Sequence, residues 1–131
     1  VRDIRHTDPG QRHDARDRVR RTDIGKRLVE GDSNEIIIMI IGLLQASLSI
    51  PESRSLKDKR QVLRSLKDRA VNKWNVSVAE VDHQDIWQSA VLAFVTVAAE
   101  KVVVEKRLSE IADALRGDPR YVLLDYETQL I

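Results

Sequence analysis

Hydrophobic and polar residues alternate along the segment that begins at Met39, which is the pattern of a β-strand. One side of this segment is apolar throughout and holds Ile40, Leu44, Ala46, Leu48 and Ile50. The other side starts with Ile41 and Leu43 and then becomes polar. Pro51 cannot donate to a strand ladder and therefore ends the strand. The pattern predicts a strand over Met39–Ile50 that becomes half-exposed toward its end.

The next segment has the apolar spacing of a helix. Its apolar residues recur on one helical face: Leu56, Leu63, Leu66, Ala70 and Trp74. Ser55 precedes this run and Asp58 follows three residues later, which fits the capping box that opens a helix. The sequence therefore predicts a helix of about five turns, at ~3.6 residues per turn.

Two further strands and a polar turn are expected after this helix. Asn75–Val81 alternates and is rich in β-branched residues, and Asp82–Asp85 is polar enough to form a turn. Trp87–Ala99 is apolar on both faces, which is typical of a strand that is covered on both sides. Because the first strand also carries apolar residues on its second side, we expect a hydrophobic sheet surface that a second copy or a partner covers.

The last two elements complete a known order. Val104, Leu108, Ile111 and Leu115 repeat at helical spacing. Gly117 is expected in a left-handed conformation at the end of that helix, before Pro119, and Tyr121–Thr128 is a final strand. The order β-α-β-β-α-β predicts an α+β, ferredoxin-like fold with an antiparallel sheet and two helices on one face. This fold hosts many functions and does not decide between them.

Residues 1–38 differ in composition from the rest of the chain. They include nine basic and eight acidic residues and few apolar ones, so we expect a disordered, charged N-terminal extension. The extension has neither the apolar stretch of a signal peptide nor the low acidic content of a transit peptide. One hypothesis is that Met39 is the true start and that the extension is not native. The folded domain is then 39–131.

Composition excludes some chemistry and locates charge. The chain has no cysteine, which excludes disulfides, a thiol nucleophile and cysteine-ligated metal sites. Its 22 basic and 21 acidic residues give a net charge of +1, so the protein is not uniformly basic. However, Arg54–Lys73 contains eight basic and two acidic residues, whereas Trp74–Ile131 contains five basic and ten acidic ones. The predicted first helix is therefore locally basic.

Four basic residues of that helix form one stripe. Lys57, Arg60, Arg64 and Lys67 are spaced at i, i+3, i+7 and i+10 and could contact successive phosphates of a nucleic acid. An ordinary solvated helix flank explains the same stripe equally well. Arg54 precedes the helix N-terminus and could help to bind a phosphate there, although an ordinary loop arginine is the favoured interpretation.

Lys59 and the residues in and after the polar turn are further candidates. Lys59 falls on the apolar side of the helix, where we expect its chain to run along the core edge with the ammonium group in water, rather than a catalytic or partner-binding role. In the polar turn, His83 with Asp82 and Asp85 could bind a metal or act as a base, but a hydrogen-bonded hairpin turn is favoured. Trp87 is expected to anchor the end of the sheet, with base stacking as the alternative.

Two stretches carry a family resemblance. SLKDKRQVLRSLKDR at 55–69 and NVSVAEVDHQDIWQSAVL at 75–92 closely resemble the bacterial YlxP-like family, a family defined by domain of unknown function 503. The resemblance covers nearly all of 39–131 and implies a small, cytoplasmic, ferredoxin-like protein. Many bacteria encode such proteins near transcription elongation, translation initiation and ribosome-maturation factors, which suggests a role linked to RNA or the ribosome. The family implies no catalytic residues and no cofactor.

The expected function is a non-catalytic module that associates with RNA or the ribosome through the basic first helix. The sequence lacks the aromatic signatures that stack bases on a sheet face, and it lacks phosphate-loop, serine-hydrolase and zinc-protease motifs. The alternative is a homo-oligomeric protein-interaction or regulatory module that packs through its apolar sheet face. An enzyme ranks third, and no metal or membrane partner is expected.

Overall fold

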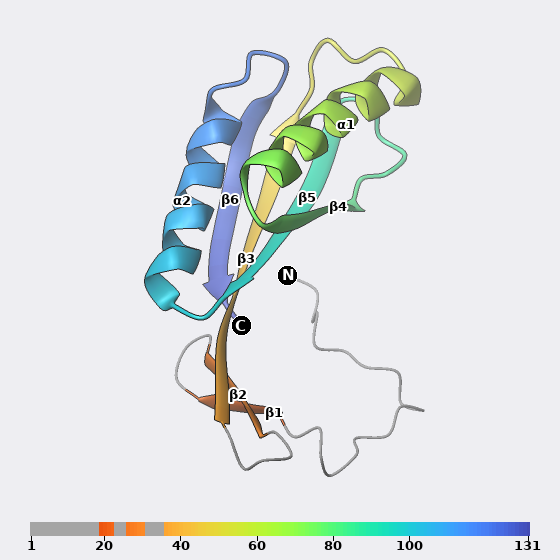
Figure 1. Cartoon of the computed structure of the whole chain (residues 1–131). Coiled ribbons are helices and arrows are strands. Elements are labelled where there is room, and N and C mark those ends of the chain that lie inside the picture. The colour runs from red at the N-terminus through yellow and green to blue at the C-terminus, as the bar shows by residue number, and fades with distance from the viewer. Residues whose placement is uncertain (1–18, 23–25, 31–35) are drawn as a thin grey trace, which may run out of the picture.

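The structure is a computed structural model that describes residues 19–22, 26–30 and 36–131 (Figure 1). In chain order its elements are β1 (Val19–Thr22), β2 (Lys26–Glu30), β3 (Ile36–Ser49), α1 (Leu56–Lys73), β4 (Val76–Asp82), β5 (Ser89–Ala98), α2 (Lys101–Arg116) and β6 (Val122–Leu130). From β3 onward the order is the predicted β-α-β-β-α-β. The α+β, ferredoxin-like fold is therefore confirmed.

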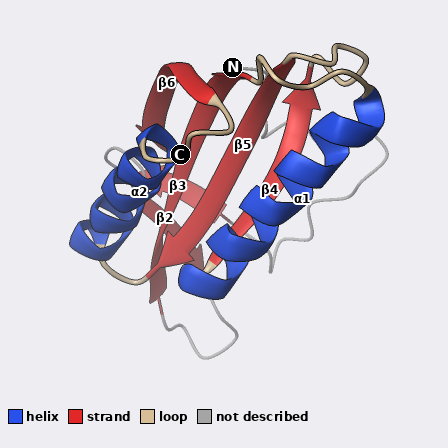
Figure 2. Ribbon diagram, turned by 90° about the horizontal axis from the view of Figure 1, so that it is seen from above, coloured by secondary structure: helices blue, strands red, loops and turns tan. Residues whose placement is uncertain are grey.

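The sheet is antiparallel throughout, and β3 and β5 lie in its middle. β5 pairs with β3 and with β4, and β6 pairs with the other side of β3. Both helices lie on one face of this sheet (Figure 2). The hydrophobic core fills the space between that face and the helices, and it includes every apolar position predicted for the first side of β3.

The two helices present their predicted apolar stripes to this core. Leu63, Leu66 and Ala70 of α1 are buried, as are Val104 and Leu108 of α2. Gly42 of β3 lies beneath α2, where an added Cβ would overlap a methyl group of Val104. The glycine therefore allows α2 to approach the sheet closely.

The opposite face of the sheet is less open than the sequence predicts. Leu43 is only 2% exposed and Val91 only 6%. Ile41 and Val95 are half-buried, whereas Val97 is 45% exposed. Val122, which pairs with Ser49 at the other end of β3, is 52% exposed, so the exposed apolar residues lie toward the two ends of the face rather than across its middle.

The start of α1 agrees with the sequence, but the end of α2 does not. The Ser55 hydroxyl accepts a hydrogen bond from the Asp58 N–H at 3.0 Å, and the Asp58 carboxylate accepts one from the Arg54 N–H at 2.9 Å. The prediction of a left-handed Gly117 is wrong, because its φ is −90° and its ψ −7°. The Gly117 N–H bonds to the Ala114 carbonyl at 3.2 Å, so the helix ends in a tighter turn that needs no positive φ.

The N-terminal region also differs from expectation. The prediction of disorder is wrong for Val19–Thr22 and Lys26–Glu30, which form strands β1 and β2. β2 pairs in antiparallel register with Ile36–Ile40 of β3, because antiparallel pairing needs only backbone groups on an open strand. β3 runs through Met39 without interruption. Residues 1–18, 23–25 and 31–35 of the expected extension lie outside the described residues. The hypothesis that Met39 is the true start stays a prediction.

Candidate functional site

Lys59 is buried, contrary to the prediction that its ammonium group reaches water. The residue is 1% exposed. Its ammonium group donates hydrogen bonds to the carbonyl oxygens of His83 at 2.8 Å, Gln84 at 3.3 Å and Ser89 at 3.1 Å. The segment between β4 and β5 curls over the first turn of α1, and these carbonyls draw the lysine inward. Lys59 therefore fastens that segment to the helix.

Glu80 balances the buried charge. Its Oε2 atom lies 2.8 Å from the Lys59 nitrogen, and its side chain is 18% exposed. An ammonium group has three N–H donors, and this one is surrounded by four acceptors, the three carbonyl oxygens and the Glu80 carboxylate. The contribution of Glu80 is electrostatic, since an unpaired charge in this position would be costly.

Gln88 connects the loop before α1 to the segment between β4 and β5. Its side-chain amide donates to the backbone carbonyl oxygens of Pro51 and Ser53, both at 3.1 Å, and the Gln88 backbone carbonyl accepts from the Ile50 N–H at 2.9 Å. The loop before α1 and the segment after β4 therefore meet at one end of the molecule (Figure 1). This brings the loop that carries Arg54 together with the loop that carries Trp87, which the sequence alone does not connect.

His83 is part of a hydrogen-bonded turn, the interpretation favoured from the sequence. Its Nδ1 lies 2.8 Å from the Ser89 hydroxyl, and its N–H donates to the Asp82 carboxylate at 2.8 Å. Its φ is 63°, in the left-handed region that histidine visits more readily than most residues. Within 19–22, 26–30 and 36–131 no group of three or more metal-ligating side chains occurs, so the alternative of a metal site at His83 has no partners there.

Trp87 does not anchor the sheet. β5 begins at Ser89, two residues later than predicted, and leaves Trp87 in the preceding turn with 51% of its surface exposed. Lys59 and Gln88 hold the backbone of this segment on the inside, so the indole is on the outside. Ile86 is 47% exposed and Asp85 is exposed beside it. The turn therefore presents an aromatic and an aliphatic side chain to solvent.

The predicted basic stripe lies on the outside of α1. Arg54, Lys57, Arg60 and Arg64 are exposed and Lys67 is half-buried. None of these five side chains forms an ion pair with another described residue. From Lys57 to Lys67 the helix rises by about 15 Å, at ~1.5 Å per residue, so the cationic groups follow one another along the helix. We refer to these five residues as the basic row.

Arg69 and Lys73 face the other way, toward α2. Arg69 pairs with Asp118, which also accepts hydrogen bonds from the Arg120 side chain at 2.8 and 3.1 Å and from the Arg120 N–H at 2.8 Å. These bonds, chiefly from the Arg120 guanidinium, hold the pKa of Asp118 well below its ordinary value. The sequence analysis missed this cluster. The signal available was Asp118-Pro119-Arg120 directly after a helix.

Comparison with known proteins shows which family the chain is similar to. The family model described as "Protein of unknown function (DUF503)" matches residues 41–128. The chain is also similar to "Uncharacterized protein YlxP" of Bacillus subtilis (strain 168), with 36% identity over 72 residues. The aligned part covers 55% of this chain and 78% of that relative. The resemblance to the YlxP-like family is therefore confirmed.

Proposed function

We propose, from the premise that this chain belongs to the DUF503 family, that it is a non-catalytic module that associates with RNA or the ribosome through α1. The observation that carries the proposal is the basic row, which runs along the outside of α1 from the end where Trp87 is exposed. The backbone phosphates of an unpaired RNA segment contact the basic row. A base at the end of that segment stacks on the Trp87 indole.

The two kinds of group suit single-stranded RNA. Lysine and arginine side chains bind phosphates and release counterions, and an exposed aromatic ring stacks on a base whatever its sequence. A solvated helix flank would explain the charges alone, but it would not require an exposed tryptophan whose segment is held by the hydrogen bonds of two side chains. Lys59 bonds the Trp87 segment to α1, and Gln88 bonds it to the loop before α1. The combination therefore favours nucleic acid.

The alternative, a homo-oligomeric module that packs through the helix-free sheet face, has weaker support. Leu43 and Val91, in the middle of that face, are already buried in the single chain, and the exposed Val97 and Val122 lie toward its two ends. A stable interface needs a broader apolar centre than this.

Charge reversal on α1 tests the proposal. We expect Arg60→Glu with Arg64→Glu to weaken binding of a fluorescently labelled oligouridylate, measured by anisotropy at a low and a high salt concentration. Losing two phosphate contacts should lower the slope of log K against log [salt] by about 1.4, at ~0.7 per contact with a single strand.

The matched control reverses two exposed lysines on α2, Lys101→Glu and Lys106→Glu, which changes the net charge equally. The control should retain the wild-type slope. The proposal is wrong if both double variants lose affinity to the same extent, because net charge alone then explains binding. The proposal is equally wrong if neither double variant changes the affinity for the oligouridylate. Co-sedimentation of the same variants with bacterial ribosomes extends the comparison to assembled particles.

A further inference from the structure

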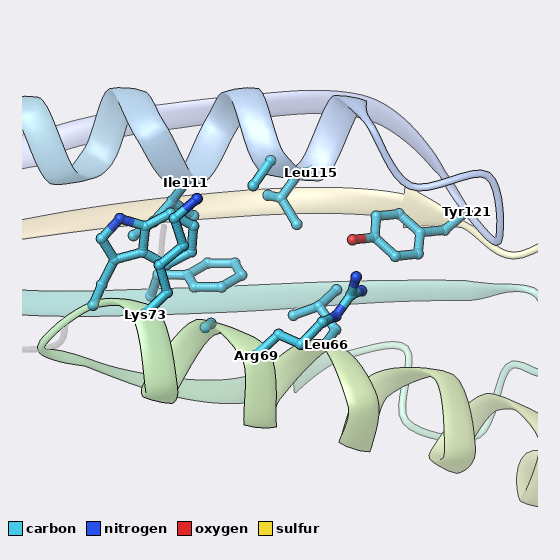
Figure 3. A pocket seen from close by; sticks show the side chains of 10 residues that line it. Leu66, Arg69, Lys73, Ile111, Leu115 and Tyr121 are labelled. Carbon is cyan, nitrogen blue, oxygen red and sulfur yellow. The ribbon is translucent and has the colours of Figure 1, made fainter.

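A cleft of about 200 Å³ lies between the C-terminal half of α1 and α2, over β5 (Figure 3). Its inner surface consists of apolar side chains that are each at most 4% exposed: Leu66, Ala70, Phe94, Ile111 and Leu115. A cavity of ~150 Å³ lined by such residues accommodates benzene. The cleft therefore has room for one aromatic ring with a short polar group.

The charged residues around the cleft are both cationic. Arg69 and Lys73 line it, and no acidic side chain does. Arg69 pairs with Asp118, but Asp118 also pairs with Arg120, so two guanidinium groups share one carboxylate. Lys73 lies over the Trp74 ring at 4.9 Å and forms no ion pair within the described residues. The cleft thus combines an apolar interior with uncompensated positive charge.

Tyr121 adds a hydrogen-bond donor. Figure 3 shows its hydroxyl pointing into the cleft at the end where the Arg69 guanidinium lies. A phenol is protonated at neutral pH and can donate to an anion, and burial raises the pKa of Tyr121 further. A carboxylate at this end would meet a guanidinium and a phenol together.

We propose that this cleft binds a small apolar carboxylate with a body the size of one aromatic ring. The ring lies on Phe94 between the helices, and Arg69 and Tyr121 bind the carboxylate, while Lys73 at the other end of the cleft adds positive potential. An amine would be repelled by the two cations, and a nucleotide is too large for the volume. The site is on the opposite flank of α1 from the basic row, so this inference does not depend on RNA binding.

Tryptophan fluorescence provides a direct test. The chain has two tryptophans, so Trp87→Phe leaves Trp74, which lines the cleft, as the sole reporter. Phenylacetate should change the fluorescence emission of Trp74 in a saturable way. The affinity should be millimolar or tighter for a ligand of this size. Benzyl alcohol, which lacks the charge, should bind at least about tenfold more weakly, and benzylamine should not bind.

Variants separate the charge from the cavity. Arg69→Gln should weaken phenylacetate about tenfold and Lys73→Gln should weaken it less, and both should leave benzyl alcohol unchanged, while Lys67→Gln, on the other flank, should leave both ligands unchanged. Ala114→Phe places a ring in the cleft and should abolish binding of both, with thermal unfolding used to verify that the variant is folded. Equal affinity for phenylacetate and benzyl alcohol, binding that survives Ala114→Phe, or no saturable binding would overturn the proposal.

Discussion

A buried ammonium group determines how the loop with Trp87 is presented. In the folded protein, three carbonyl oxygens and the Glu80 carboxylate replace the water molecules around the Lys59 ammonium group. The arrangement stabilises the fold only as a complete set, because removing one member leaves the others buried without a partner.

Lys59→Met should therefore destabilise the protein strongly, by about 3–5 kcal/mol, since Glu80 and the three carbonyl oxygens lose their common partner. Urea denaturation measures the loss. Lys57→Met, an exposed lysine of the same helix, is the control and should change the free energy of unfolding by less than about 0.5 kcal/mol. Equal effects of the two substitutions would show that the buried contacts contribute nothing.

The position of Lys59 could be predicted at this scale, but its environment could not. Helical spacing places it correctly on the apolar side of α1. Its partners are 21 to 30 residues away in sequence, and three of them are backbone oxygens, which no side-chain pattern reveals. For the same reason the sequence favours Trp87 as an anchor of the sheet over an exposed indole, because the exposure depends on where the backbone is held.

Among the elements, Asp118 connects α1 with the segment between α2 and β6. Its side chain is 5% exposed and accepts bonds from Arg69 on α1 and from Arg120 just before β6. Helix α1 itself is predictable from its apolar spacing and the Ser55 cap, because both signals are local. The bridge from Arg69 to Asp118 spans 49 residues and is set by the packing of the two helices.

The depressed pKa of Asp118 has a consequence for acid stability. A carboxyl group whose pKa is lowered in the folded state stabilises the protein above its unfolded pKa of ~3.9, and this stabilisation is lost as pH falls toward the folded pKa. Asp118→Asn should therefore cost about 1.5–3 kcal/mol at pH 7. The difference from wild type should shrink as pH falls below about 4.

Thermal unfolding between pH 7 and pH 2 checks this difference. Asp113→Asn serves as the control, because Asp113 is exposed and pairs only with Arg116 on the same helix among the described residues. The thermal stability of the Asp113→Asn control should differ from that of wild type by the same small amount at all pH values. A constant gap between wild type and Asp118→Asn down to pH 2 would contradict the assignment.

For the molecule as a whole, the arrangement of charge matters more than its sum. The net charge of +1 hides a basic first helix and an acidic remainder. The β-α-β-β-α-β order and the core side of each helix follow from periodicity, so the overall fold could be predicted. The meeting of the loops before α1 and after β4, and the cleft between the helices, arise from tertiary packing. Local sequence patterns do not predict such tertiary packing.

The central claim is that α1 and the Trp87 turn form one RNA-binding surface. The most direct measurement is titration of the isotope-labelled protein with a short oligouridylate, followed by backbone amide shifts in NMR spectra. The account predicts that shifts concentrate at residues 54–67 and 83–88, with the Trp87 indole N–H among the largest. Shifts confined to α2 or the helix-free sheet face, or no shifts at all, would contradict it.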